Sequence, residues 1–219
     1  MPRLLFLLGC LMLAAFGSAQ TVRAQEQSAN LRLLAAARAG EAAGVTRALA
    51  DGATPNARNR GGETALVIAL KNGRTDLARQ MLDAGTDVNL AAVNGVTPLM
   101  AAAHAGLVEV VRSLLARGAE IGAVDRLQKN AMTYAAGQGH TEIVLLLVSA
   151  GVDPNATYAH SLTALMWAAG YGHTETVRSL LAAGARAELK DDRGKTALDI
   201  AREGAFSETV KVLETAARG

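Results

Sequence analysis

The chain has a single cysteine, four prolines and few aromatic residues. One cysteine cannot form a disulfide within the chain, so a stable fold has to rest on packing. Four prolines in 219 residues exclude a proline-rich, low-complexity chain. Aromatic residues make up only 3% although half of the sequence is apolar, which leaves Ala, Leu and Val to supply the apolar mass. Side chains of this size favour thin, closely packed helices over a thick globular core.

Net charge is also almost absent, with 22 Lys and Arg residues against 20 Asp and Glu residues. A protein that binds nucleic acid or an anionic membrane through general electrostatics carries a marked excess of positive charge. The composition therefore argues against both partners. The length of 219 residues fits one domain or a repeat array of similar mass.

The N-terminus has the layout of a secretory signal peptide. Arg3 precedes an apolar run over residues 4–16, and small residues follow. This run is too short to cross about 30 Å of hydrocarbon as a helix. We predict a cleavable signal peptide over residues 1–24, with an alternative cut after residue 19, and a periplasmic or secreted protein without a membrane span after cleavage. Residues 25–29 are expected to form a short polar tail.

Cys10 offers an alternative interpretation of this segment. The sequence Leu7-Leu8-Gly9-Cys10 loosely resembles a lipoprotein cleavage box. A lipid on Cys10 would leave further apolar residues of the run on the mature chain. We therefore expect Cys10 to be an ordinary apolar residue of the signal.

Beyond the signal, several residue types recur at intervals of 33. One row is Thr64, Thr97, Asn130, Thr163 and Thr196. Two glycine rows are Gly73, Gly106, Gly139 and Gly172, and Gly52, Gly85, Gly118, Gly151 and Gly184. An acidic row is Asp76, Glu109, Glu142, Glu175 and Glu208. Several rows in one register indicate an array of structural repeats.

Each row has a physical role in a helix–turn–helix unit. The Thr or Asn side chain can accept an orphan backbone N–H at the start of a first helix. The first glycine row ends that helix in a left-handed conformation. The acidic row opens a second helix, whose dipole favours negative charge there. A stripe along the second helix predicts its buried face, at Met81, Leu114, Leu147, Leu180 and Leu213.

The repeat is similar to the ankyrin repeat. The segment Thr97-Pro98-Leu99-Met100-Ala101-Ala102 resembles the T-P-L-H-x-A signature, and residues 139–144 resemble the start of the family's second helix. The resemblance implies an all-α solenoid of about six helix-turn-helix units joined by short hairpin-like loops. We expect it to cover residues 30–219, in units of about 30–58, 59–91, 92–124, 125–157, 158–190 and 191–219. The outer two units are expected to be caps, because nothing stacks on their far sides.

The chain departs from the family pattern at one position. The histidine that follows T-P-L is missing from every unit, where Val67, Met100, Thr133, Met166 and Asp199 stand instead. Hydrogen bonds that this histidine makes between repeats are therefore not expected.

Fragments of catalytic motifs are better explained by the repeat. Gly194-Lys195-Thr196 lacks the first glycine of a phosphate-binding loop, because Leu189 stands there. His140 and His173 occupy equivalent positions in successive units, about 10 Å apart, which is too far to share one metal ion. We expect no catalytic residue, no cofactor and no metal site.

The resemblance implies a non-enzymatic protein–protein interaction module or scaffold, which binds through the hairpin tips and the concave face of the first helices. A secreted effector that binds a host protein is an alternative, and a metal-handling or hydrolytic protein on the same scaffold is a weaker one. We expect a monomer that binds another protein and no nucleic acid. The candidate binding residues are Arg60, Lys71, Val93, Val96, His104, Arg126, Leu127, His160, Leu162, Trp167, Tyr171 and Arg193. For Trp167, the alternative role is simply to fill the gap between units.

Overall fold

A computed structural model describes residues 22–217 of the protein, and every regular element in that range is a helix. The chain begins this range with a helix over residues 22–39. It continues through α2 (Ala42–Ala50), α3 (Ala65–Lys71), α4 (Thr75–Asp83), α5 (Pro98–His104), α6 (Val108–Ala116), α7 (Ala131–Gln138), α8 (Thr141–Ser149), the 3-10 turn η1 (Ala159–Ser161), α9 (Ala164–Gly170), α10 (Thr174–Ala182), α11 (Ala197–Glu203) and α12 (Ser207–Ala216). The expected all-α fold is confirmed.

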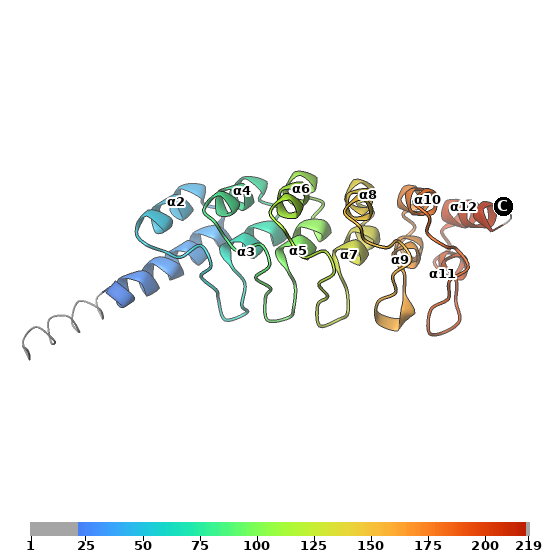
Figure 1. Ribbon diagram of the computed structural model, residues 1–219, viewed down its shortest axis with the longest axis horizontal. Coiled ribbons are helices and arrows are strands. Elements are labelled where there is room, and N and C mark those ends of the chain that lie inside the picture. Colours follow the sequence, from blue (N-terminus) through green and yellow to red (C-terminus); the bar gives the residue numbers. More distant parts are fainter. Residues whose placement is uncertain (1–21, 218–219) are drawn as a thin grey trace, which may run out of the picture.

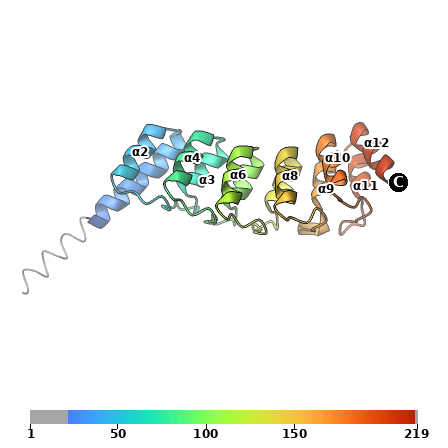
Figure 2. The same cartoon turned by 45° about the horizontal axis from the view of Figure 1, so that its top comes forward.

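The helices form an elongated array of pairs (Figure 1). The second helices α2, α4, α6, α8, α10 and α12 make one row, and the first helices make a parallel row beside it. Long loops between successive pairs project to one side of the array (Figure 1). The same stacking of pairs is visible after rotation (Figure 2).

The predicted signal peptide falls mainly outside the described residues, as do its earlier cut site and Cys10. Within residues 22–217, the segment 25–29, expected as a short polar tail, is part of the helix that covers residues 22–39. Ala29 and Leu33 of this helix are fully buried. The position of the helix-start threonine holds Leu31, whose side chain cannot accept a backbone N–H. Nothing at Leu31 therefore forces the helix to begin there.

The predicted capping row is confirmed at all five of its positions. Thr97 Oγ1 accepts the Met100 backbone N–H over 3.3 Å, and Asn130 Oδ1 accepts that of Thr133 over 3.0 Å. Pro98 occupies the first helical position of α5, where a missing N–H costs nothing. Equivalent caps start the other first helices, at Thr64, Thr163 and Thr196.

One continuous core runs along the array between the two rows of helices. The predicted second-helix stripe lies in it, with no exposed surface at Met81, Leu114, Leu147, Leu180 or Leu213. The first helices contribute a row of fully buried alanines, whose small side chains let neighbouring units approach closely: Ala69, Ala102, Ala135, Ala168 and Ala201. Apolar burial across every junction is therefore the main stabilising term.

Two constraints act together at the turn between α7 and α8. Gly139, with a φ of 74°, has the left-handed conformation that glycine adopts without strain. A Cβ atom on Gly139 would also lie 2.6 Å from His173 Nδ1 of the next unit. The glycine thus permits both the turn and the close approach of the following repeat.

The last unit has a polar outer side. Arg202 and Glu214 replace apolar residues of the inner units, and they form an ion pair with a 2.7 Å separation. This pair fits the expected cap. Within residues 22–217, no helix combines the length and the apolar character that crossing a membrane requires.

Candidate functional site

Three of the five hairpin loops begin with an anchoring side chain that the repeat pattern did not predict. Asp125 Oδ1 accepts the backbone N–H groups of Leu127 and Lys129, over 2.8 and 2.9 Å. Asn59 and Asp191 anchor the second and sixth hairpins in the same way. The row was hard to find from the sequence because Ala92 and Tyr158 interrupt it.

Backbone hydrogen bonds also join each hairpin tip to the next. Val93 N–H donates to the Gly61 carbonyl over 2.8 Å, and Arg126 N–H donates to the Asn94 carbonyl over 3.0 Å. The later junctions are made by Ala159 to Gln128 and by Asp192 to His160. The tips therefore form one connected edge, which holds their side chains at fixed separations.

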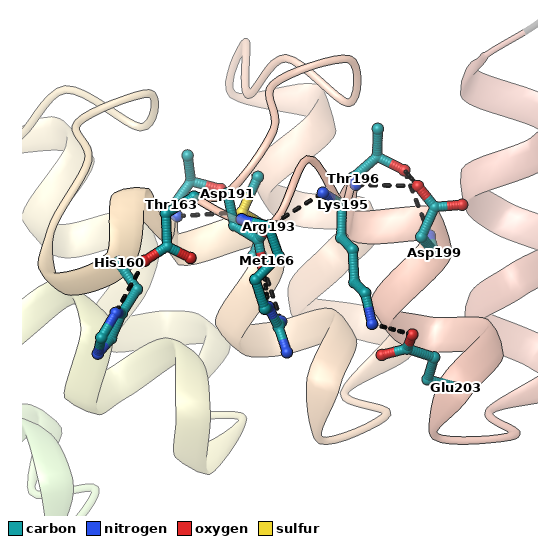
Figure 3. Close-up of polar contacts among 10 residues, drawn as sticks. His160, Thr163, Met166, Asp191, Arg193, Lys195, Thr196, Asp199 and Glu203 are labelled. Atoms are coloured by element: carbon teal, nitrogen blue, oxygen red, sulfur yellow. Dashed lines mark hydrogen bonds and ion pairs between the residues drawn. The ribbon is translucent and has the colours of Figure 1, made fainter.

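Ion pairs of opposite direction lie at the two ends of the surface that the hairpins and the first helices form. In the second unit, Glu63 at the base of the hairpin pairs with Lys71 at the end of α3, 2.7 Å away. The hydrogen bonds from Lys71 and Asn59 lower the pKa of the Glu63 carboxyl. In the sixth unit the charges are exchanged, and Lys195 pairs with Glu203 of α11 (Figure 3).

The centre of the surface is built from aromatic rings and one lysine. Lys129 occupies the same repeat position as Glu63 and Lys195. The repeat position that supplies the ion-pair partner in those units holds Gly137 in this one. The Lys129 ammonium group instead lies 4.2 Å from the centre of the Trp167 ring, a cation–π contact. Trp167 stacks on Tyr171 with ring centres 6.2 Å apart.

One buried and one half-buried polar group belong to this centre. Trp167 Nε1 has no hydrogen-bond partner within residues 22–217. Tyr134 donates its hydroxyl hydrogen to Asp125 Oδ2 over 2.6 Å, and burial together with this carboxylate raises the pKa of Tyr134. The Tyr134 phenol is thus held neutral and fixed in place at the base of the fourth hairpin.

A hollow of about 270 Å³ opens on the concave face between α3, α5 and α7. Its lining is Glu63, Val67, Lys71, Ala92, Asn94, Val96, Met100, Ala101, His104 and Tyr134. Aliphatic side chains form its floor, and charged or polar groups stand around them. Such a hollow has the character of a receptor for one apolar side chain of a ligand.

The predicted binding residues fall into two groups. Exposed side chains are Arg60, Lys71, Val93, His104, Arg126, Leu127, His160, Tyr171 and Arg193. Half-buried ones are Val96, Leu162 and Trp167. The structure brings Lys71, Val96 and His104 together at the hollow and pairs Trp167 with Tyr171.

The fifth and sixth hairpins use part of their charge in contacts within the protein. His160 Nδ1 lies 2.9 Å from Asp192 Oδ2, which links the fifth and sixth tips. Arg193 contacts Asp191 Oδ2 over 2.7 Å within one tip (Figure 3). These predicted residues are therefore already engaged in contacts within the protein.

The histidines of the second-helix turns have a structural role. His140 Nε2 contacts the His104 carbonyl over 3.1 Å, and His173 Nε2 contacts the Gly137 carbonyl over 3.0 Å. Each bond ties a unit to the preceding first helix. Over the part of the chain that the structure describes, no three His, Cys, Asp or Glu side chains are placed to hold a metal ion.

Comparison with known protein families identifies the repeats. A family model described as ankyrin repeats (3 copies) matches residues 33–125, 84–158 and 132–217. No curated protein matches the chain.

Proposed function

Because the chain belongs to the ankyrin-repeat family, we propose that it is a non-enzymatic module that binds another protein through its hairpin tips and concave face. Ankyrin repeats are generally protein–protein interaction modules. The proposal adds a specific surface to that general role. We also propose that the protein acts outside the cytoplasm, because its N-terminal sequence has the layout of a secretory signal peptide.

Exposed apolar side chains carry the proposal. Val93, Leu127 and Tyr171 are 51%, 65% and 57% exposed, on consecutive units of one face. Apolar groups gathered on one face of a monomer indicate a contact surface, since covering them releases water. The connected tips hold Val93 and Leu127 in place, and Tyr171 stacks on Trp167 at the end of α9, so little conformational entropy is lost when a partner binds.

The test is a comparison of two faces of the same molecule. Once the partner has been isolated by crosslinking from the envelope fraction, calorimetry should show that Tyr171→Ala and Leu127→Ala each weaken binding by at least about 1 kcal/mol. The matched controls are Arg79→Ala and Arg112→Ala on the outer side of the second helices, which should leave the affinity almost unchanged. Circular dichroism verifies that all four variants remain folded.

The opposite result would contradict the proposal. If the Arg79 and Arg112 variants lost binding and the Tyr171 and Leu127 variants kept it, the partner would occupy the second-helix side.

A further inference from the structure

The hairpin tips carry more positive than negative charges, and the two signs also differ in how many already have a partner within the protein. The tip segments 58–63, 91–96, 124–129, 157–162 and 190–195 contain seven Lys and Arg residues and four carboxylates. Every one of the four carboxylates is occupied within the protein. Glu63 contacts Lys71, Asp125 contacts Tyr134, Asp191 contacts Arg193, and Asp192 contacts His160.

Several of the cations, by contrast, remain available. Arg60, Arg126 and Lys190 form no ion pair within residues 22–217, and Lys129 contacts aromatic rings in place of a carboxylate. Arg60 and Arg126 are exposed and stand two tips apart, on either side of Val93. The tip side of the molecule therefore presents positive charge that the protein does not neutralise.

The second-helix side has the reverse balance. The segments 74–90, 107–123, 140–156, 173–189 and 206–217 contain seven Lys and Arg residues against eleven Asp and Glu residues. The nearly neutral composition thus conceals a polarised molecule, positive along the tips and negative on the opposite side. Such polarity orients a charged partner before contact and speeds association.

From this arrangement we infer that the partner presents an extended acidic segment with one large apolar side chain. The inference rests on the proposed function and specifies the chemistry of its partner. The apolar side chain occupies the hollow of about 270 Å³, which Val96 helps to line, and carboxylates on either side of it reach Arg60 and Arg126. Lys129 provides a further cation beside the hollow, on the Tyr134 ring.

The spacing of the units gives the spacing of this segment. Stacked helices lie about 10 Å apart, so Arg60 and Arg126 are separated by about 20 Å along the array. A segment in the polyproline II conformation advances about 3.1 Å per residue, covers that distance in about six residues and places every third side chain on the same side. The expected pattern is an Asp or Glu, two residues of any type, a large apolar residue, two further residues and a second Asp or Glu.

A single-stranded nucleic acid fits this surface less well, although it is also anionic. It would bring a phosphate to every nucleotide, and the cations of the tips would have to follow that spacing. The tip of the third unit carries the exposed Val93 and no Lys or Arg between residues 91 and 96. The phosphates that cross that tip would lie on apolar surface.

The experiment is selection of random peptides displayed on phage against the purified protein, followed by affinity measurement of the selected peptides. We expect Asp or Glu three residues before and after a large apolar residue. Binding should weaken by about 10-fold or more in Arg60→Glu/Arg126→Glu, a factor that corresponds to about 1.4 kcal/mol. The matched control is Arg79→Glu/Arg178→Glu, which changes the net charge equally on the second-helix side and should stay within about twofold.

The outcomes separate the two levels of the proposal. The selected peptides could be neutral or basic and bind Tyr171→Ala more weakly than the unchanged protein. That result would overturn the inference of an acidic partner and leave the proposed binding surface in place. Equal weakening by the two double variants would overturn the assignment of charge to the tips. Binding of a 15-nucleotide poly-dT strand as tightly as the best peptide would favour a nucleic acid partner instead. Selected peptides that are insensitive to every concave-face variant would overturn the proposed function itself.

Discussion

At the tips of the fourth and fifth units, the backbone has a conformation that suits glycine but carries other residues. The equivalent positions of the remaining tips are Gly62, Gly95 and Gly194, all with positive φ. Gln128 and Ser161 adopt φ values of 56° and 57° at those positions, and His160 adds a third value of 61°. A side chain in this region costs about 1–2 kcal/mol. These strained tips flank Leu127 and the Trp167–Tyr171 pair, as strained backbone often does at binding surfaces.

The strain can be measured by exchanging residues along this row. Ser161→Gly should raise the free energy of unfolding by up to about 1 kcal/mol. The backbone strain that glycine relieves in the folded state outweighs the free energy that its greater conformational entropy gives to the unfolded chain. The reverse exchange, Gly194→Ser, should lower it by about 1 kcal/mol. A Cβ atom at Gly194 meets nothing within 4 Å, so only the backbone conformation is tested. Urea denaturation gives both values, and two changes of the same sign would contradict this account.

Individual elements are stabilised chiefly by the second-helix stripe. Leu114 in α6 has no exposed surface, so Leu114→Ala leaves a cavity that should cost about 2–5 kcal/mol of unfolding free energy. Glu214 in α12 lies on the outer side of the last unit, and its exposed ion pair with Arg202 contributes little. Glu214→Ala should therefore cost no more than about 0.5 kcal/mol. Denaturant midpoints compare the two, and equal losses would refute this assignment of inner and outer positions.

The sequence was sufficient for features that depend on one unit and its neighbour. Repeated Thr and Gly positions predicted the helix starts and turns because caps and left-handed turns are local requirements. The side-chain contacts of the binding surface were not predictable in this way. They depend on single residues that differ from unit to unit, such as Lys129 opposite Gly137, which leaves the lysine free to contact Trp167. The helix over residues 22–39 also passes through the expected tail, because its continuation depends on the absence of a cap at Leu31.

At the scale of the whole molecule, we propose that the N-terminal segment directs the array out of the cytoplasm. We predict export with removal of the signal peptide, so mass spectrometry of the mature protein should find an N-terminus near Gln20 or Gln25. Cell fractionation should recover this form from the periplasm or the medium. An intact chain that begins at Met1 and stays in the cytoplasm would end this interpretation.

The cut site also changes the charge of the mature protein. Cleavage after residue 24 removes Arg3 and Arg23, which leaves 20 Lys and Arg residues against 20 Asp and Glu residues. Orientation by net charge is then absent, and the difference between the tip side and the second-helix side is what remains to orient a partner.

The backbone bonds between neighbouring tips have a mechanical consequence. A repeat array bends most easily when its units rotate about one edge, and here a second edge is tied at every junction from Gly61 to Asp192. Bending that separates the tips would break these bonds, while the core beneath them resists compression. The curvature of the concave face is therefore fixed before a partner arrives. A ligand whose contact side chains have the wrong spacing would have to break these bonds, so we expect the array to discriminate between ligands by length as well as by chemistry.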